Sequence, residues 1–148
     1  MKLLSTIVLL SLALISTNAI AQYAGVSIIN KGIGVNAGIL ANNVNIQAAL
    51  TFPIVNLENS NTYSLSAGYQ INLTNDDADN YSFTPSIGAA LVKSRKWDSK
   101  AVMTVYEQIK LVYGAELGKD AYMGRVFIHA NYSDALYYGL GMKVFFKR

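Results

Sequence analysis

Apolar and polar residues alternate along most of this chain. Over positions 63–73 the odd residues are Tyr, Leu, Ala, Tyr, Ile and Leu, and the even residues are Ser, Ser, Gly, Gln and Asn. Successive side chains of a β-strand point to opposite sides, so a period of two predicts a strand with one apolar and one polar face. Segments with helical periodicity are almost absent after the first 21 residues. The alternation therefore predicts an all-β fold.

The same alternation recurs in seven other segments, and each has roughly the length that a tilted strand needs to cross a bilayer. The segments are 24–30, 33–41, 44–52, 81–91, 105–117, 122–132 and 138–146. Turn-forming residues separate them at 30–32, 42–43, 57–60, 75–80, 93–100, 118–120 and 133–134. We expect a single domain that folds as an eight-stranded antiparallel up-and-down β-barrel.

The first 21 residues have the pattern of a signal peptide. Lys2 is followed by a largely apolar segment, Leu3–Ile15, and then by the small-x-small sequence Ala19-Ile20-Ala21. This predicts cleavage before Gln22 and a mature barrel domain of residues 22–148. The alternative is an N-terminal membrane anchor, but the apolar segment is shorter than the ~20 residues of a spanning helix.

Composition excludes several classes of protein. Only 14% of the 148 residues are charged and 52% are hydrophobic, which argues against a disordered chain. The chain has no Cys, so it has no disulfide, no thiolate metal site and no lipoprotein anchor. No Gly-rich phosphate loop, metal cluster or catalytic carboxylate pair is apparent, and we expect no cofactor. An exported barrel with a pI of about 9.1 is not expected to meet nucleic acid.

The polar face of the strands indicates which side of the barrel faces outward. The exterior of a soluble protein carries about 25–35% charged residues. Here the polar face consists mostly of Ser, Thr, Asn, Gln and Gly. Small uncharged side chains suit the narrow lumen of an eight-stranded barrel, which its own side chains fill without leaving a channel. We therefore predict that the polar face lines the lumen and the apolar face contacts lipid.

Aromatic residues on the apolar face support a membrane position, because Tyr and Phe near the ends of spanning strands form girdles at the two interfaces. With the N-terminus at the periplasmic end, six fall toward that end: Tyr69, Tyr81, Phe83, Tyr113, Tyr122 and Phe146. Four fall toward the outer end: Phe52, Tyr63, Tyr132 and Tyr138.

The last segment, 138–146, alternates apolar residues and ends on an aromatic residue, with Lys147 and Arg148 following it. It resembles the C-terminal signature of outer-membrane β-barrel proteins of Gram-negative bacteria. In architecture the mature chain resembles the small OmpA/OmpX-type barrels. The resemblance implies a location in the outer membrane, with outer-membrane lipid and lipopolysaccharide as partners. It also implies recognition of the last strand by the barrel-assembly machinery.

Few residues carry candidate chemistry. A polar and charged network is predicted inside the lumen, since unpaired buried charge is costly; its members are Lys110, Glu116, Arg125, His129 and Lys143. Lipid A deacylases are eight-stranded barrels that use a His-x-Ser pair. Here Asn131 stands two positions after His129, the only histidine, and no Glu follows Glu116. We therefore expect no catalytic residues.

The segment 93–100 is the most basic part of the chain, whereas 75–80 is acidic. On the assigned topology the basic segment faces outside, where Arg95, Lys96 and Trp97 are candidates for contacts with lipopolysaccharide. The alternative is a solvated loop with a Trp anchor.

These features favour a non-enzymatic outer-membrane barrel, expected to be a monomer, with a structural or surface-interaction role. Two alternatives remain from other classes. One is a lipid A-modifying hydrolase centred on His129. The other is a soluble periplasmic barrel, similar to a lipocalin, that binds an apolar ligand.

Overall fold

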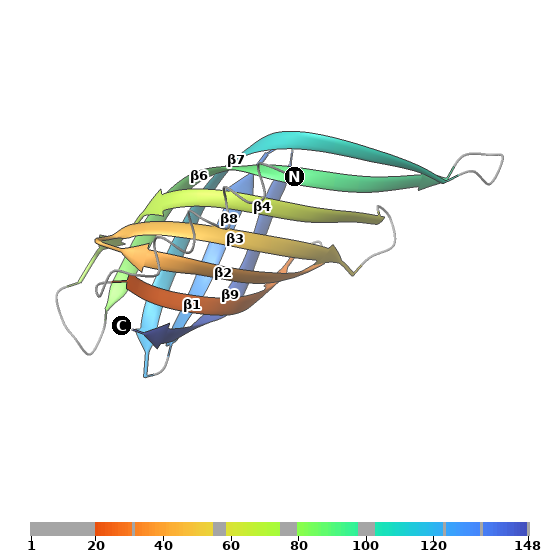
Figure 1. The fold of residues 1–148 in the computed structure, drawn as a ribbon. Helices are drawn as coiled ribbons and strands as arrows, with labels where there is room; N and C mark the ends of the chain where they lie inside the picture. Colours follow the sequence, from red (N-terminus) through yellow and green to blue (C-terminus); the bar gives the residue numbers. More distant parts are fainter. Residues whose placement is uncertain are drawn as a thin grey trace.

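The structure is a computed structural model that describes residues 20–30, 32–54, 59–74, 80–97, 103–122, 124–133 and 135–147. It forms one antiparallel sheet that closes on itself (Figure 1). The strands are β1 (Ile20–Ile29), β2 (Gly32–Ala41), β3 (Val44–Pro53), β4 (Asn59–Tyr69), β5 (Ile71–Asn72), β6 (Tyr81–Trp97), β7 (Met103–Ala121), β8 (Gly124–Tyr132) and β9 (Leu136–Lys147). Closure occurs where β1 pairs with β9.

β4 and β5 are two parts of one barrel strand, so the wall has eight strands. Both pair with β6. The interruption is at Gln70, whose backbone N–H donates instead to the carbonyl of Asn43 at 2.7 Å. The predicted fold class, an eight-stranded antiparallel up-and-down barrel, is confirmed. The segment 63–73, predicted as one uninterrupted strand, is broken at this irregularity.

The turn between β2 and β3 has two residues, Asn42 and Asn43, and both have positive φ angles of 48° and 69°. A two-residue hairpin turn with positive φ at both positions matches the right-handed twist of the strands that it joins. Asn tolerates this left-handed region better than other residues with a side chain. The sequence signal therefore marks this turn correctly.

The two faces of the sheet are sorted as the alternation predicts. Large apolar side chains point outward, among them Ile28, Ile109 and Leu140, which are 64%, 80% and 58% exposed. Inside the barrel, Ser82 and Lys143 are almost completely buried. The outer surface of the barrel is thus apolar and its interior is polar. No helix in the described part of the chain is long and apolar enough to cross a membrane.

β6 and β7 are much longer than their neighbours, with 17 and 19 residues. They stay paired up to Trp97 and Met103, whereas the pairing of β7 with β8 stops at Tyr113 and Tyr132. The hairpin therefore projects far beyond β8, but beyond β4 only at its tip, because β4 pairs with β6 as far as Asn59 and Arg95 (Figure 1). We call this the hairpin end, and the opposite end, with the turns at Asn42–Asn43 and at Tyr122, the turn end.

One predicted turn is wrong and another is wrong in part. Gly118, Lys119 and Asp120 belong to β7, and residues 93–97 of the predicted turn 93–100 belong to β6, while 98–100 lie outside the described residues. In both segments the backbone pairs with a neighbouring strand, which outweighs the local turn preference of Gly, Asp and Lys. The turn after β7 instead begins at Tyr122.

Two predicted features lie mostly outside the described residues. They are the signal peptide, of which residues 1–19 are not described, and the acidic turn, of which residues 75–79 are not described. β1 begins at Ile20, two residues before the predicted cleavage point.

Candidate functional site

Two ion pairs occupy the half of the lumen near the turn end. Glu116 on β7 and Lys143 on β9 point inward, and Lys143 Nζ lies 2.7 and 2.6 Å from the two carboxylate oxygens of Glu116. The Lys143 side chain is 2% exposed and that of Glu116 is 13% exposed. A buried charge is tolerated when a partner and hydrogen bonds replace its hydration, and each of these two groups supplies both to the other.

Arg125 on β8 forms the second pair. Its Nε donates to Asp120 Oδ1 at 2.7 Å, and its Nη1 donates to Gln70 Oε1. Asp120 also accepts a hydrogen bond from Asn80 Nδ2 at 3.2 Å. Asp120 was predicted to lie in a turn and not in the lumen. Extending the alternation of β7 by two positions beyond Gly118 would have placed it on the lumen face with Glu116.

Aromatic rings close the spaces around these charges. Lys143 Nζ lies 4.7 Å from the ring centroid of Tyr23 and 4.8 Å from that of Phe127. The guanidinium of Arg125 lies 5.6 Å from the ring centroid of Phe145. A cation within about 6 Å of an aromatic face is attracted by the ring quadrupole. Charges and rings together form a plug, which we define as Tyr23, Glu116, Asp120, Arg125, Phe127, Lys143 and Phe145.

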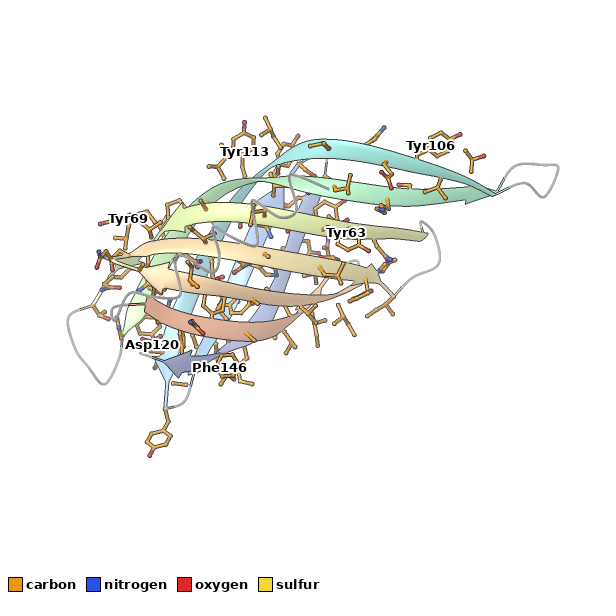
Figure 2. All side chains as sticks on the ribbon, viewed as in Figure 1. Tyr63, Tyr69, Tyr106, Tyr113, Asp120 and Phe146 are labelled. Atoms are coloured by element: carbon orange, nitrogen blue, oxygen red, sulfur yellow. The ribbon has the colours of Figure 1, made fainter. Side chains whose placement is uncertain are left out.

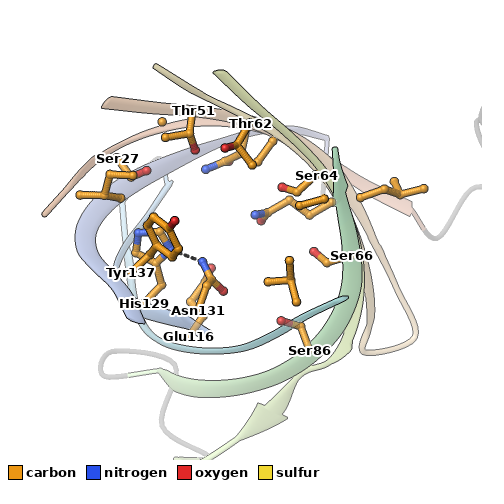
Figure 3. Close-up of a pocket in the computed structure, with 18 of the residues that line it drawn as sticks. Ser27, Thr51, Thr62, Ser64, Ser66, Ser86, Glu116, His129, Asn131 and Tyr137 are labelled. Atoms are coloured by element: carbon orange, nitrogen blue, oxygen red, sulfur yellow. Dashed lines mark hydrogen bonds between the residues drawn. The ribbon is translucent and has the colours of Figure 1, made fainter. Parts of the chain in front are cut away.

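The half of the lumen near the hairpin end is hollow. A cavity of about 120 Å³ lies above the plug, with Glu116, His129 and Asn36 among its lining residues. Figure 3 shows side chains from several strands pointing into this space, including the small side chains of Thr62, Ser64 and Ser86. The prediction that side chains fill the whole lumen is therefore wrong for this half. The side chains of Ser, Thr and Ala are too short to touch one another across the lumen, and Gly has no side chain.

His129 lies at the side of the cavity on β8. Its Nδ1 is 3.3 Å from Asn131 Nδ2, a contact that favours the tautomer in which Nδ1 accepts. Nε2 is buried and has no hydrogen-bond partner among the residues that the structure describes. Lys110, the fifth residue of the predicted network, lies farther along β7, opposite Ala90 of β6.

All ten aromatic residues of the predicted girdles are exposed on the outside of the barrel. Phe146 and Tyr69 lie near the turn end, and Tyr63 lies toward the hairpin end (Figure 2). Tyr113 was expected at the opposite end from Tyr132, but the two are direct partners across β7 and β8. In Figure 2 Tyr113 lies between Tyr69 and Tyr63, so it does not lie with Tyr69 and Phe146 at the turn end. The reason is the length of β7, which puts position 113 at the middle of the strand.

The projecting hairpin carries charge on the same face that is apolar below it. Lys93 Nζ is 2.7 Å from Glu107 Oε1, and both side chains are partly exposed. Glu107 is the one charge on the apolar face of its segment, and the pair shows where that face stops being uniformly apolar. The backbone of Arg95, Lys96 and Trp97 lies in the strand beyond this pair. The side chains of these three residues lie outside the described part of the structure.

Within the described residues, no group of three or more His, Asp or Glu side chains could hold a metal ion. The site thus consists of an apolar barrel exterior, a plugged lumen with a cavity above the plug, and a projecting hairpin. This combination has the architecture of small outer-membrane β-barrels.

Solved structures share the fold. The N-terminal β-barrel domain of Pseudomonas aeruginosa OprF superposes with a TM-score of 0.60 at 15% identity, over 88% of this chain and 98% of that domain. Ail, the attachment invasion locus protein of Yersinia pestis, gives 0.54 at 16% identity, over 86% of this chain and 96% of Ail. A further structure of Ail, in complex with the heparin analogue sucrose octasulfate, gives 0.53. No family model matches the sequence, and no curated protein matches it.

Proposed function

We propose that this protein is an integral outer-membrane barrel with a non-enzymatic surface-interaction role, in which the β6–β7 hairpin makes the contacts outside the membrane. The observation that carries the proposal is the continuation of the β6–β7 ladder to Trp97 and Met103, beyond the end of β8. β4 also pairs with β6 as far as Asn59 and Arg95, so the hairpin is supported on that side and only its tip is two-stranded. Such a paired ladder presents a defined surface, which a flexible loop of the same length does not.

The apolar exterior supports the membrane location. A soluble barrel would expose side chains such as Ile28, Leu111 and Leu140 to water over its whole circumference, at a cost of about 25 cal/mol for each Å² of apolar surface. In a bilayer the same surface contacts acyl chains. The shared fold with OprF and Ail agrees with this location, and the alternating C-terminal strand is the segment that we expect the barrel-assembly machinery to read.

Lipopolysaccharide is the partner that we propose for the hairpin. Arg95 and Lys96 follow the Lys93–Glu107 pair, where the outward face is no longer uniformly apolar. Cations at this level attract the phosphates of a neighbouring lipid surface, and Trp97 has the amphipathic side chain typical of such an interface.

Membrane fractionation tests the location. Folded protein in the outer-membrane fraction should migrate differently in gel electrophoresis before and after boiling, because closed barrels resist detergent until they are heated. Recovery in the soluble periplasmic fraction would contradict the proposal and favour the ligand-binding soluble barrel.

The lipid contact is tested with the double variant Arg95→Gln/Lys96→Gln. The matched control, Lys119→Gln/Lys147→Gln, removes the same charge at the turn end. Refolded proteins are mixed with lipopolysaccharide-containing and with neutral phospholipid vesicles, and the gain in thermal stability on lipopolysaccharide is measured. We expect the hairpin variant to lose most of this gain and the control to keep it. Equal losses would contradict a contact through the hairpin.

The hydrolase alternative is tested with His129→Ala. A lipid A mass profile that is unchanged from cells with the unaltered protein agrees with the non-enzymatic role. A lipid A species that depends on His129 would establish the hydrolase.

A further inference from the structure

We propose that the free edge of β7 in the projecting hairpin is a docking site for an extended segment of another polypeptide, which joins the sheet as one antiparallel strand. The proposal rests on the surface-interaction role proposed above and names the class of partner for β7. The lipid contact proposed there concerns Arg95 and Lys96 on β6. The evidence is the register of the strands, the direction of the backbone groups at this edge and the exposure of both faces.

The hairpin-end half of β7 is paired on one side only. Toward β6 its ladder is continuous from Met103 to Lys119, whereas toward β8 the ladder ends at Tyr113. Among the strands that the structure describes, none lies beside positions 103–112 on the β8 side. Residues 104–109 are all exposed, so both faces of this stretch are open as well as its edge.

The ladder identifies the backbone groups that point to the free edge. The N–H of Asp120 donates to the carbonyl of Asn80 at 3.0 Å, on the β6 side. Backbone groups of successive residues in an antiparallel strand point to alternate sides, and the register between β6 and β7 is uninterrupted. Even-numbered residues of β7 therefore bond to β6. The N–H and C=O groups of Val105, Glu107 and Ile109 point to the free edge, where no described strand pairs with them.

These backbone groups have the spacing of a β-strand. They recur every two residues, which is roughly 7 Å along an extended chain. A second antiparallel strand presents its own N–H and C=O groups with the same repeat, so it can bond to all of them at once. A sugar or a lipid headgroup does not have this repeat. The spacing therefore favours a polypeptide as the occupant.

The edge lacks the features that usually prevent the addition of a strand. Edge strands in proteins are commonly short, or they carry Pro, Lys or a bulge. Positions 103–109 contain neither Pro nor Lys and show no register shift against β6. Val105, Tyr106 and Ile109 are residue types that favour strands. This part of β7 is therefore a regular and unprotected edge.

The side chains along the edge define the chemistry of the partner. Val105 and Ile109 are 51% and 80% exposed on the outward face, and Glu107 lies between them. Directly opposed side chains in an antiparallel pair contact each other, and apolar pairs and opposite charges are favourable. The partner segment thus has an apolar, a basic and an apolar residue at alternate positions. Lys93 contacts Glu107 from the β6 side, and the basic residue of the partner approaches from the other side.

A second copy of this chain in the same membrane does not fit the edge. Both barrels would cross the membrane in the same direction, so their β7 strands would run in the same direction. A strand that continues the line of β8 runs antiparallel to β7. A separate polypeptide outside the membrane can take that direction.

The test uses the full-length mature barrel refolded in dodecylphosphocholine micelles without lipopolysaccharide. The probe is a short synthetic peptide in which Val, Lys and Val alternate with Thr. A control peptide has the same side chains but carries backbone N-methyl groups on its Val and Lys residues. Hydrogen exchange of the β7 amides is followed by NMR.

We expect the probe to slow exchange at the odd-numbered residues of 105–109 only, because the even-numbered amides already bond to β6. The effect should saturate with a dissociation constant below about 1 mM. The N-methylated peptide should have no effect, since it lacks the donors that the edge carbonyls would accept.

Matched variants separate the backbone from the side chain. Ile109→Pro removes an N–H that points to the free edge and leaves the bonds to β6, and edge strands accept Pro at such positions. Ile109→Val keeps the N–H and a similar side chain. We expect Ile109→Pro to weaken peptide binding by about tenfold or more and Ile109→Val to change it by less than about twofold. Val105→Pro is the second edge variant, in case Ile109→Pro does not give the heat-dependent gel shift of a folded barrel.

Three outcomes would overturn the proposal. Unchanged exchange up to about 10 mM peptide, far above the expected dissociation constant, would mean that the edge binds no strand. Equal binding of the N-methylated peptide, or equal binding by Ile109→Pro, would show that the contact does not use the edge. Slower exchange of the odd-numbered amides with rising protein concentration and no peptide would identify a second copy as the occupant. Since lipopolysaccharide is absent, these outcomes are independent of the lipid contact through Arg95 and Lys96.

Discussion

Glu116 and Lys143 belong to strands that do not pair with each other, yet Lys143 Nζ lies within 2.7 Å of both carboxylate oxygens of Glu116. The contact reaches past β8, which lies between β7 and β9 in the wall. It forms because the lumen of an eight-stranded barrel is narrow enough for long side chains from different walls to meet.

Removing one partner of this pair should destabilise the barrel strongly. Glu116→Gln leaves the buried Lys143 ammonium without its counter-charge, and a loss of about 3–5 kcal/mol is expected. The measurement is urea unfolding in phospholipid vesicles, with the folded fraction read from the heat-dependent gel shift.

The double variant Glu116→Leu/Lys143→Met is the control, since it removes both charges and keeps apolar volume. It should recover most of the lost stability. If Glu116→Gln alone unfolds at the urea concentration of the unaltered protein, the pair does not stabilise the plug.

The position of the membrane should be measurable with two arginine substitutions on the outward face of β7. Leu117 lies in the barrel, between Phe83 and Ile128, whereas Val105 lies in the projecting hairpin. Leu117→Arg should cost up to about 2–4 kcal/mol, because a charge on the lipid-facing side of a barrel strand is poorly solvated. Val105→Arg should change the unfolding free energy by less than about 0.5 kcal/mol, as for most surface substitutions. Equal effects in vesicle unfolding experiments would disagree with a membrane that ends below the hairpin.

Cysteine labelling should report the orientation, since the chain has no cysteine of its own. Thr104→Cys places a thiol on the exposed part of the hairpin, and Tyr122→Cys places one at the fully exposed turn of the opposite end. A membrane-impermeant maleimide should label the first in intact cells. It should label the second only after the outer membrane is permeabilised. The reverse pattern would mean that the hairpin faces the periplasm.

The Asn42–Asn43 turn should be sensitive to the loss of residues that tolerate positive φ. Replacing both with Ala should cost roughly 1–2 kcal/mol for each residue held in the left-handed region. Asn43→Gly should retain or raise stability, because Asn-Gly is a preferred pair for this turn. Both variants are compared by urea unfolding, and a fully stable Ala-Ala variant would contradict the turn geometry.

The fold could be predicted from the sequence because its main signal is local. Side chains alternate along a strand with a period of two, so the lumen and the outer faces can be read from segments such as 63–73 without knowledge of any neighbour. The two Asn residues at 42–43 likewise encode their own turn.

Several errors concern places where pairing with a neighbouring strand determines the structure. Gly118, Lys119 and Asp120 have turn preferences, but pairing with β6 and β8 keeps them in the strand. Register also places Tyr113 beside Tyr132, which no property of position 113 alone reveals. Asp120 was missed as a partner of Arg125 for the same reason.

The sequence by itself determined most of each strand, its inward and outward faces, and three of the four charged residues of the plug, Glu116, Arg125 and Lys143. Only the tertiary structure decided which charges pair, how far the β6–β7 hairpin extends, and that one half of the lumen is plugged while the other is hollow. Alternation is a property of a single strand. The ion pairs, the extension of the β6–β7 hairpin past β8 and the cavity in the lumen depend instead on distances between strands, which the order of residues does not contain.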